Sequence, residues 1–274
     1  MNDKNKNLLS RLVTALALLP IVLWMLWEGG YVGSTLLGLT AALCVYEYLT
    51  ITVKHLSPMG ILTMVAAGAM PLFVTWKPFE AAALVCAAGG SVFFLSWIWH
   101  LLKGPLAEAP TLSAHMMAAL IYGGTGTTAI AALRNLPDGG SWVVAALAIT
   151  WGNDTSAYFA GRFLGKHKLY PEVSPNKTWE GFAGGLFGSV ACLFIMKASV
   201  FPSLRVVDCL VVGLIGGLFG PAGDLCESML KRAYGVKDSG TLLPGHGGML
   251  DRIDALLFNA PVVLLYVQFI ATRA

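Results

Sequence analysis

The sequence predicts an all-α protein, a polytopic integral membrane helical bundle with about nine transmembrane helices. Mean hydropathy is +0.69, with 56% of the 274 residues hydrophobic and 12% charged. A soluble domain of this size cannot bury that much apolar surface. Apolar runs of about 20 residues, long enough to cross a bilayer as helices, are separated by short polar breaks. Because these runs are continuous and do not alternate, a transmembrane β-barrel is not expected.

The expected spans are separated at glycine, proline and charged residues. The first run follows a basic start, NDKNKNLLSR, and has no A-x-A cleavage pattern. We therefore expect it to be retained as a span, not removed as a signal peptide. Later runs end at similar breaks, such as Lys77-Pro78 after the third. The nine expected spans are residues 8–27, 31–53, 60–76, 79–101, 113–133, 142–162, 181–201, 206–230 and 252–272.

Lysine and arginine are unevenly divided between the two sides of this arrangement. Nine spans place thirteen of the eighteen on the amino-terminal side and four on the other, with Lys197 near the outer end of its span. Because cytoplasmic loops are richer in Lys and Arg, we expect the amino terminus and the long polar loops 163–180 and 231–251 to be cytoplasmic. The expected location is the cell inner (plasma) membrane, multi-pass. Residues 1–140 would form a lipid-facing scaffold and residues 141–274 would carry the catalytic site.

Several carboxylates lie at or near the cytoplasmic end of the expected bundle. Asp154 precedes Arg162 by eight residues and Asp224 precedes Lys231 by seven, which places both about 10–12 Å from the same face. Asp251 and Asp254 follow at i, i+3 on one helical face. Acids in a bilayer are costly unless they are paired, protonated or bound to a cation. A divalent cation with oxygen ligands, Mg²⁺, would collect them.

Basic residues and a glycine-rich turn crowd the same face. Lysines and arginines there, beside metal-bound acids, would suit a polyphosphate. The turn PGHGG, residues 244–248, precedes a helix start, where backbone N–H groups and the helix dipole favour an anion. His246 lies between two glycines and is expected to donate to a phosphate or leaving group. The basic residues are Lys166, Lys168, Lys177, Lys231, Arg232, Lys237 and Arg252.

Structural explanations compete with these functional ones. A basic cytoplasmic loop is often only a topology signal, and an Asp in the first turn of a helix commonly stabilises the helix dipole. These explanations do not account for Asp154 and Asp224 at matched depth. Glu47, in VYEYL within the second span, remains open between a distant contributor to the site and a helix-packing acid.

The segment SMLKRAYGVKDSGTLLPGHGGMLDRID, residues 228–254, resembles the signature of phosphatidate cytidylyltransferases, also called CDP-diacylglycerol synthases. K-R, K-D, H-G-G and D-R-x-D stand at the family's spacing. Residues 153–181 resemble the family's second block, with Ser156 where Gly is expected. The matching blocks together run from about residue 150 to 256. Earlier residues match in hydropathy and length alone.

The resemblance implies an enzyme that condenses CTP with phosphatidic acid to give CDP-diacylglycerol and pyrophosphate, with Mg²⁺. The implied partners are CTP, phosphatidic acid and the lipid bilayer, with no nucleic acid; the oligomeric state is open, with a homodimer as one option. Expected metal ligands are Asp224, Asp251, Asp254 and Asp238. Expected catalytic residues are Asp251, Lys231, Arg232, Lys237 and His246. Expected substrate-binding residues are Asn153, Asp154, Lys166, Ser174, Lys177, Ser228, Gly247, Gly248 and Arg252.

Two other functions compete with this reading. A CTP-dependent kinase of polyprenyl or phytyl alcohols shares parts of the architecture, but it would need a base to deprotonate a hydroxyl. A cation transporter could also place acids at one depth, but it is expected to carry them near the midplane, on broken helices in paired halves. The sequence leaves open the acyl-chain preference, the number of metal ions and the path by which lipid enters.

Overall fold

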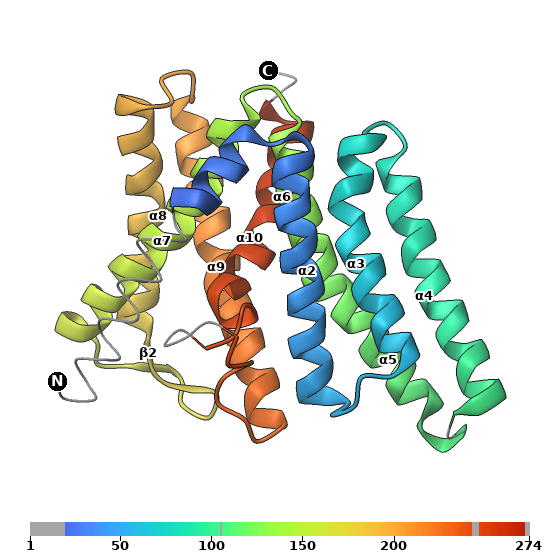
Figure 1. Ribbon diagram of the computed structural model, residues 1–274. Coiled ribbons are helices and arrows are strands. Elements are labelled where there is room, and N and C mark those ends of the chain that lie inside the picture. The colour runs from blue at the N-terminus through green and yellow to red at the C-terminus, as the bar shows by residue number, and fades with distance from the viewer. Residues whose placement is uncertain (1–19, 105, 243–246, 272–274) are drawn as a thin grey trace, which may run out of the picture. The chain divides into compact units, whose positions relative to one another are not determined.

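The computed structural model describes residues 20–104, 106–242 and 247–271, and these are mostly helical (Figure 1). The all-α class is confirmed, with one local addition in the described residues. A short antiparallel hairpin, β1 (Lys168–Tyr170) and β2 (Ser174–Thr178), lies within the segment expected as a polar loop. The helices are α2 (Gly30–Thr52), α3 (Pro58–Trp76), α4 (Ala81–Lys103), η1 (Leu106–Glu108), α5 (Ala109–Ala119), η2 (Leu120–Thr125), α6 (Gly126–Arg134), α7 (Gly139–Leu164), α8 (Trp179–Ser199), α9 (Val206–Ala233) and α10 (Leu250–Phe269).

Six helical segments in the described ranges are long and apolar enough to cross a membrane, so the chain is a multi-pass membrane protein. They are α2, α3, α4, the continuous segment Leu106–Arg134, α8 and α9. The expected count of nine is not confirmed. The first expected span, residues 8–27, lies mostly outside the described residues. Helices α7 and α10 are not among the six, and both carry charged residues of the candidate site.

The chain divides into two compact units. The first consists of Met1–Asn135 and Val236–Arg252, and the second of Leu136–Gly235 and Ile253–Ala274. A segment late in the sequence therefore belongs to the same unit as the amino-terminal helices. Helix α10 begins in the first unit and continues in the second.

Glycines allow the helices of the first unit to pack closely. A Cβ atom on Gly38 of α2 would collide with the carbonyl oxygen of Gly68 in α3. The π-helical turn η2 joins α5 to α6 and contains Gly123, where a Cβ would lie 3.1 Å from Cys44 Cβ. Small residues at such contacts let the helix backbones approach closely. In lipid the hydrophobic effect does not bring helices together, so their association depends on this close packing.

In the second unit, α7 and α8 also approach through small residues. A Cβ atom on Gly184 or Gly188 of α8 would collide with Ala160 or Ser156 of α7. Helix α8 begins directly after β2, because Thr178 accepts a hydrogen bond from Gly181 N at 3.1 Å and so caps the helix. The hairpin is thereby held at the start of α8.

Helix α9 contains Pro221, and α7 compensates for the hydrogen bond that this proline removes. Proline has no N–H, so the carbonyl of Gly217, four residues earlier, loses its partner within the helix. The Asn153 side chain on α7 donates to that carbonyl at 3.0 Å and to Ser189 Oγ at 3.1 Å. Asn153 is 2% exposed. Its buried amide therefore links α7 to both α8 and α9 by hydrogen bonds.

The end of α9 differs from the expected boundary. The span was expected to end at residue 230, with Lys231 and Arg232 in the following loop. The helix continues to Ala233, and both basic residues lie in its last turn. The negative end of the helix dipole favours cations there, which explains why charge does not end the helix earlier.

Candidate active site

The second unit contains a cavity of about 550 Å³. Its wall comes from α7, the hairpin, the first turn of α8 and the middle of α9. Pro221 lies in this wall, one turn before Asp224. The structure brings together five residues expected from sequence along this cavity: Asn153, Asp154, Ser174, Lys177 and Asp224.

An ion pair crosses the cavity wall between the hairpin and α9. Lys177 Nζ in β2 lies 2.8 Å from Asp224 Oδ2. Ser228, one turn later on α9, donates a hydrogen bond of 3.3 Å to Asp224 Oδ1. The position of Asp224 is therefore set both by its own helix and by a lysine from the hairpin.

The charge of Asp224 acts on two further carboxylates, Asp154 and Asp254. Asp154 on α7 lines the same cavity, and the charges of Asp154, Asp224 and Asp254 influence one another. Asp254 Oδ1 accepts a hydrogen bond of 2.8 Å from Ala255 N in the first turns of α10. Three acids from three helices thus lie within electrostatic reach of one another.

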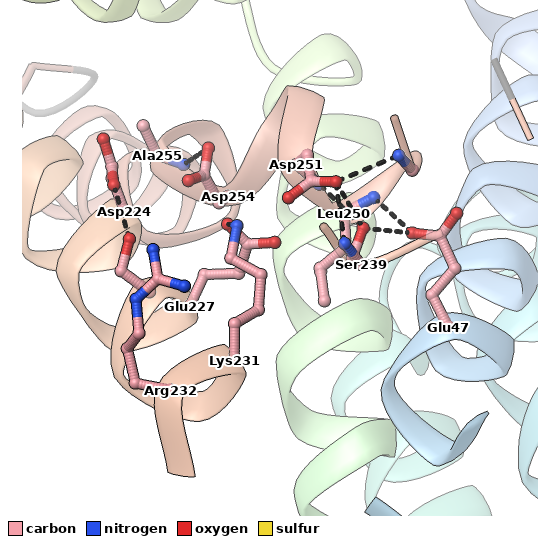
Figure 2. A network of polar contacts seen from close by, with 12 residues as sticks. Glu47, Asp224, Glu227, Lys231, Arg232, Ser239, Leu250, Asp251, Asp254 and Ala255 are labelled. Atoms are coloured by element: carbon pink, nitrogen blue, oxygen red, sulfur yellow. Dashed lines mark hydrogen bonds and ion pairs between the residues drawn. The ribbon is translucent and has the colours of Figure 1, made fainter. Parts of the chain in front are cut away.

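Lys231 and Glu227 form a buried pair on α9. Lys231 Nζ lies 2.8 Å from Glu227 Oε2, and the residues are 8% and 1% exposed. Figure 2 shows the two side chains next to each other. The spacing is i, i+4, which brings the side chains together on one helical face. Lys231, expected to hold a phosphate, therefore has an anionic partner within its own helix.

Asp251 accepts several hydrogen bonds within the first unit. Its Oδ2 accepts from Ser239 N at 2.8 Å and from Gly248 N at 3.0 Å. Ser239 Oγ lies 2.9 Å from the same oxygen. Ser239 also donates to Glu47 of α2 at 2.9 Å, and Figure 2 shows both carboxylates linked to this serine.

Comparison with known proteins identifies the family. The model of the cytidylyltransferase family matches residues 9–270. The chain belongs to this family. It is therefore a nucleotidyltransferase, and the match covers the amino-terminal helices as well as the later blocks.

Curated relatives match along nearly the whole chain. A phosphatidate cytidylyltransferase of Staphylococcus haemolyticus is 37% identical over 268 residues. Proteins of the same name from Staphylococcus saprophyticus and Staphylococcus aureus are 35% and 36% identical over 265 residues. Each alignment covers 94% of this chain and 98% of the relative. The resemblance read from the motifs is confirmed at the level of the family.

The remaining expected residues of this cytidylyltransferase family member are spread over both units. Lys237 and Asp238 are exposed in the first unit, as is Arg252 at the start of α10. Gly247 has φ +81°, a backbone conformation that favours glycine. The Lys166 backbone N donates to Glu180 Oε2 at 3.1 Å. His246 lies outside the described residues.

Three contacts were not found from the sequence. Ser239 links two acids, Glu227 pairs with Lys231, and Glu180 lies 2.6 Å from His167 Nδ1 and anchors the hairpin loop. The i, i+4 spacing of Glu227 and Lys231 could have suggested their pair. No local pattern could have suggested Ser239, because its partner Glu47 is 192 residues away.

The acids of the second unit fit Mg²⁺ by their donor chemistry. Among the residues that the structure describes, no three His, Cys, Asp or Glu side chains converge as a metal cluster. Mg²⁺ does not require such a cluster, because it commonly takes one or two carboxylates and completes its shell with water and substrate phosphates. Asp224, whose charge acts on Asp154 and Asp254, supplies that kind of donor.

Proposed function

We propose that this family member is a phosphatidate cytidylyltransferase. The reaction joins CTP and phosphatidic acid to give CDP-diacylglycerol and pyrophosphate. The observation that carries the proposal is the cavity of about 550 Å³ in which Lys177 meets Asp224 beside Asp154. The lysine suits a phosphate group, and the acids suit the Mg²⁺ that would accompany a triphosphate. The names of the relatives, which align over 94% of this chain, support the choice of lipid substrate.

The proposed chemistry is an in-line displacement. A phosphatidate phosphate oxygen attacks the α-phosphorus of CTP, a new P–O bond forms, and the bond to the β-phosphate oxygen breaks to release pyrophosphate. The phosphatidate nucleophile is already ionised, so no general base has to remove a proton. Catalysis then depends on positioning and on neutralising charge in the transition state.

The cations of the chain would do most of that neutralisation. Lys177 lies in the cavity wall and would contact a phosphate of CTP while keeping Asp224 oriented. Lys231 and Arg232, in the last turn of α9, would stabilise the departing pyrophosphate or the lipid phosphate. Mg²⁺, when bound, would offset phosphate charge, with Asp224, Asp251, Asp254 and Asp238 as its proposed ligands.

The orientation completes the proposal. The excess of basic residues on one side supports a cytoplasmic active site and amino terminus. CTP would arrive from water on that side and phosphatidic acid from the bilayer, so both substrates could meet without either crossing the membrane.

The direct test is the transfer of label from CTP to lipid. Purified protein in detergent receives α-labelled CTP and phosphatidic acid, with and without Mg²⁺. Label that enters the lipid phase only when Mg²⁺ and phosphatidate are both present would support the proposal. If γ-labelled CTP instead phosphorylates an added polyprenyl alcohol, the kinase function replaces it. Inactivity in both assays, from protein that remains folded, would count against both enzymes.

A further inference from the structure

Glu47 is a buried acid of α2, and in the described part of the chain its side chain accepts hydrogen bonds from residues 239, 249 and 250. It is 3% exposed. Met249 N donates to Oε1 at 2.8 Å, Leu250 N donates to Oε2 at 2.8 Å, and Ser239 Oγ donates to Oε2 at 2.9 Å. Both carboxylate oxygens are therefore engaged by the segment that ends at the first residue of α10.

Two glycines leave room for this carboxylate. A Cβ atom on Gly240 would lie 2.8 Å from Glu47 Oε1, and one on Gly248 would lie 2.5 Å from Oε2. Neither position could carry a side chain unless the carboxylate moved. Glycine at these two positions is thus required by the Glu47 carboxylate. From sequence, the glycines here were expected to let the backbone approach an anionic ligand.

The same segment holds Asp251. Its Oδ2 accepts N–H groups from Ser239 and Gly248, residues at the two ends of the loop. Ser239 Oγ lies 2.9 Å from both Glu47 Oε2 and Asp251 Oδ2. Its single proton can be donated to one carboxylate at a time, so the two acids share one hydroxyl.

We propose that Glu47 is a positioning residue of the active site, which orients Asp251 through Ser239 and holds the start of α10. This inference rests on the proposed function, in which Asp251 is a metal ligand. An ordinary helix cap is supplied by a local Ser, Thr, Asp or Asn. An acid brought from α2 into an apolar bundle is costly and marks function by default. It also makes the geometry of the loop depend on the amino-terminal helices.

Glu47→Gln tests this role with little change in shape. Both carboxylate oxygens of Glu47 accept hydrogen bonds, but the glutamine amide has only one oxygen. Its NH₂ group would stand where the second oxygen was and face an N–H or O–H donor. We expect kcat, or the apparent affinity for Mg²⁺, to fall by about 10–100-fold, the usual effect of losing a residue that orients a metal ligand. KM for CTP should change less. Amide hydrogen exchange in residues 239–242 and 247–250 should become faster.

Asp208→Asn is the matched control. Asp208 is also 3% exposed and lies on α9, bonded to Arg205 and Tyr266. This variant should lower the unfolding temperature but leave the Mg²⁺ dependence of turnover unchanged. Ser239→Ala removes only the shared hydroxyl. It should reproduce part of the Glu47→Gln defect and add little to it in the double variant.

Several outcomes decide the proposal. Glu47→Gln with wild-type kcat and wild-type Mg²⁺ dependence would overturn it, even if the loop exchanged faster, because the residue would then be structural alone. If Glu47→Gln does not fold in detergent, Ser239→Ala decides by the same readouts. If wild-type protein makes no labelled lipid, the proposed function fails separately. Calorimetric titration of Mg²⁺ into the wild type, Glu47→Gln and Ser239→Ala then decides the role of Glu47. Equal affinities for Mg²⁺ would reject the positioning role.

Discussion

Lys177 Nζ lies 2.8 Å from Asp224 Oδ2, so the hairpin strand β2 is joined to helix α9 at the wall of the cavity. The two residues are 47 positions apart, and each was expected at the site for a separate reason. Their pairing makes the hairpin part of the acidic site. A segment expected from sequence as a polar loop with substrate-binding residues is therefore a hairpin that contributes a cation beside the acids.

Lys177→Met should reduce activity far more than stability. The Lys177 and Asp224 side chains are 26% and 36% exposed, so the pair contributes at most about 1 kcal/mol to folding. A cation acting on transition-state charge is worth about 100-fold or more in rate. The measurement is kcat/KM for CTP beside thermal unfolding in detergent. Lys77→Met, which breaks the exposed pair with Glu80, is the control and should change neither. A large loss of stability with little loss of rate would contradict this role.

Asp224→Asn and Asp251→Asn should each abolish turnover and leave the protein folded. Each change removes a charge proposed to hold Mg²⁺, which is worth several kcal/mol, on the order of 1000-fold in rate. Labelled-lipid formation measures activity, and gel filtration in detergent checks folding. Near-normal activity in either variant would remove that residue from the metal site.

Removal of the Asn153 amide should destabilise the protein to an extent that depends on Pro221. Asn153→Ala leaves the buried Gly217 carbonyl without its donor at 3.0 Å, a loss of about 1–3 kcal/mol in unfolding free energy. In a Pro221→Ala background, the restored N–H at residue 221 can bond Gly217 within α9. The cost of Asn153→Ala should therefore be smaller there. Equal costs in the two backgrounds, measured by unfolding in detergent, would show that Asn153 does not replace the bond lost at the proline.

Gly248→Ala should disrupt the site from the loop side. A methyl group there would collide with Ser239 Oγ and lie 2.5 Å from Glu47 Oε2, so the loop or the acid has to move, at a cost of about 1–3 kcal/mol. We expect a lower unfolding temperature and a loss of activity. Gly90→Ala in α4 is the control, because a Cβ at Gly90 meets nothing within 4 Å. A Gly248→Ala variant with wild-type activity would contradict the geometry of this loop.

Local patterns were enough for the helical class and for most helix positions. Residues 31–53 were expected to span and α2 is Gly30–Thr52; residues 206–230 were expected and α9 is Val206–Ala233. Hydrophobic length carries this information directly, because a helix in lipid satisfies its backbone only within itself. The hairpin β1–β2 was not expected, since a few paired residues in a polar loop leave no periodic signal.

The sequence by itself determined that this is a membrane protein of the cytidylyltransferase family and which acids and bases belong to its motifs. Those features are local, since they depend on apolar length, residue type and fixed spacing. Only the tertiary structure decided which of these residues meet. Lys177 pairs with Asp224, and Asn153 with the Gly217 carbonyl. Glu47 bonds to Ser239, a residue 192 positions later. Such contacts depend on how helices pack through small residues, and a linear pattern carries no record of which buried polar groups must satisfy one another.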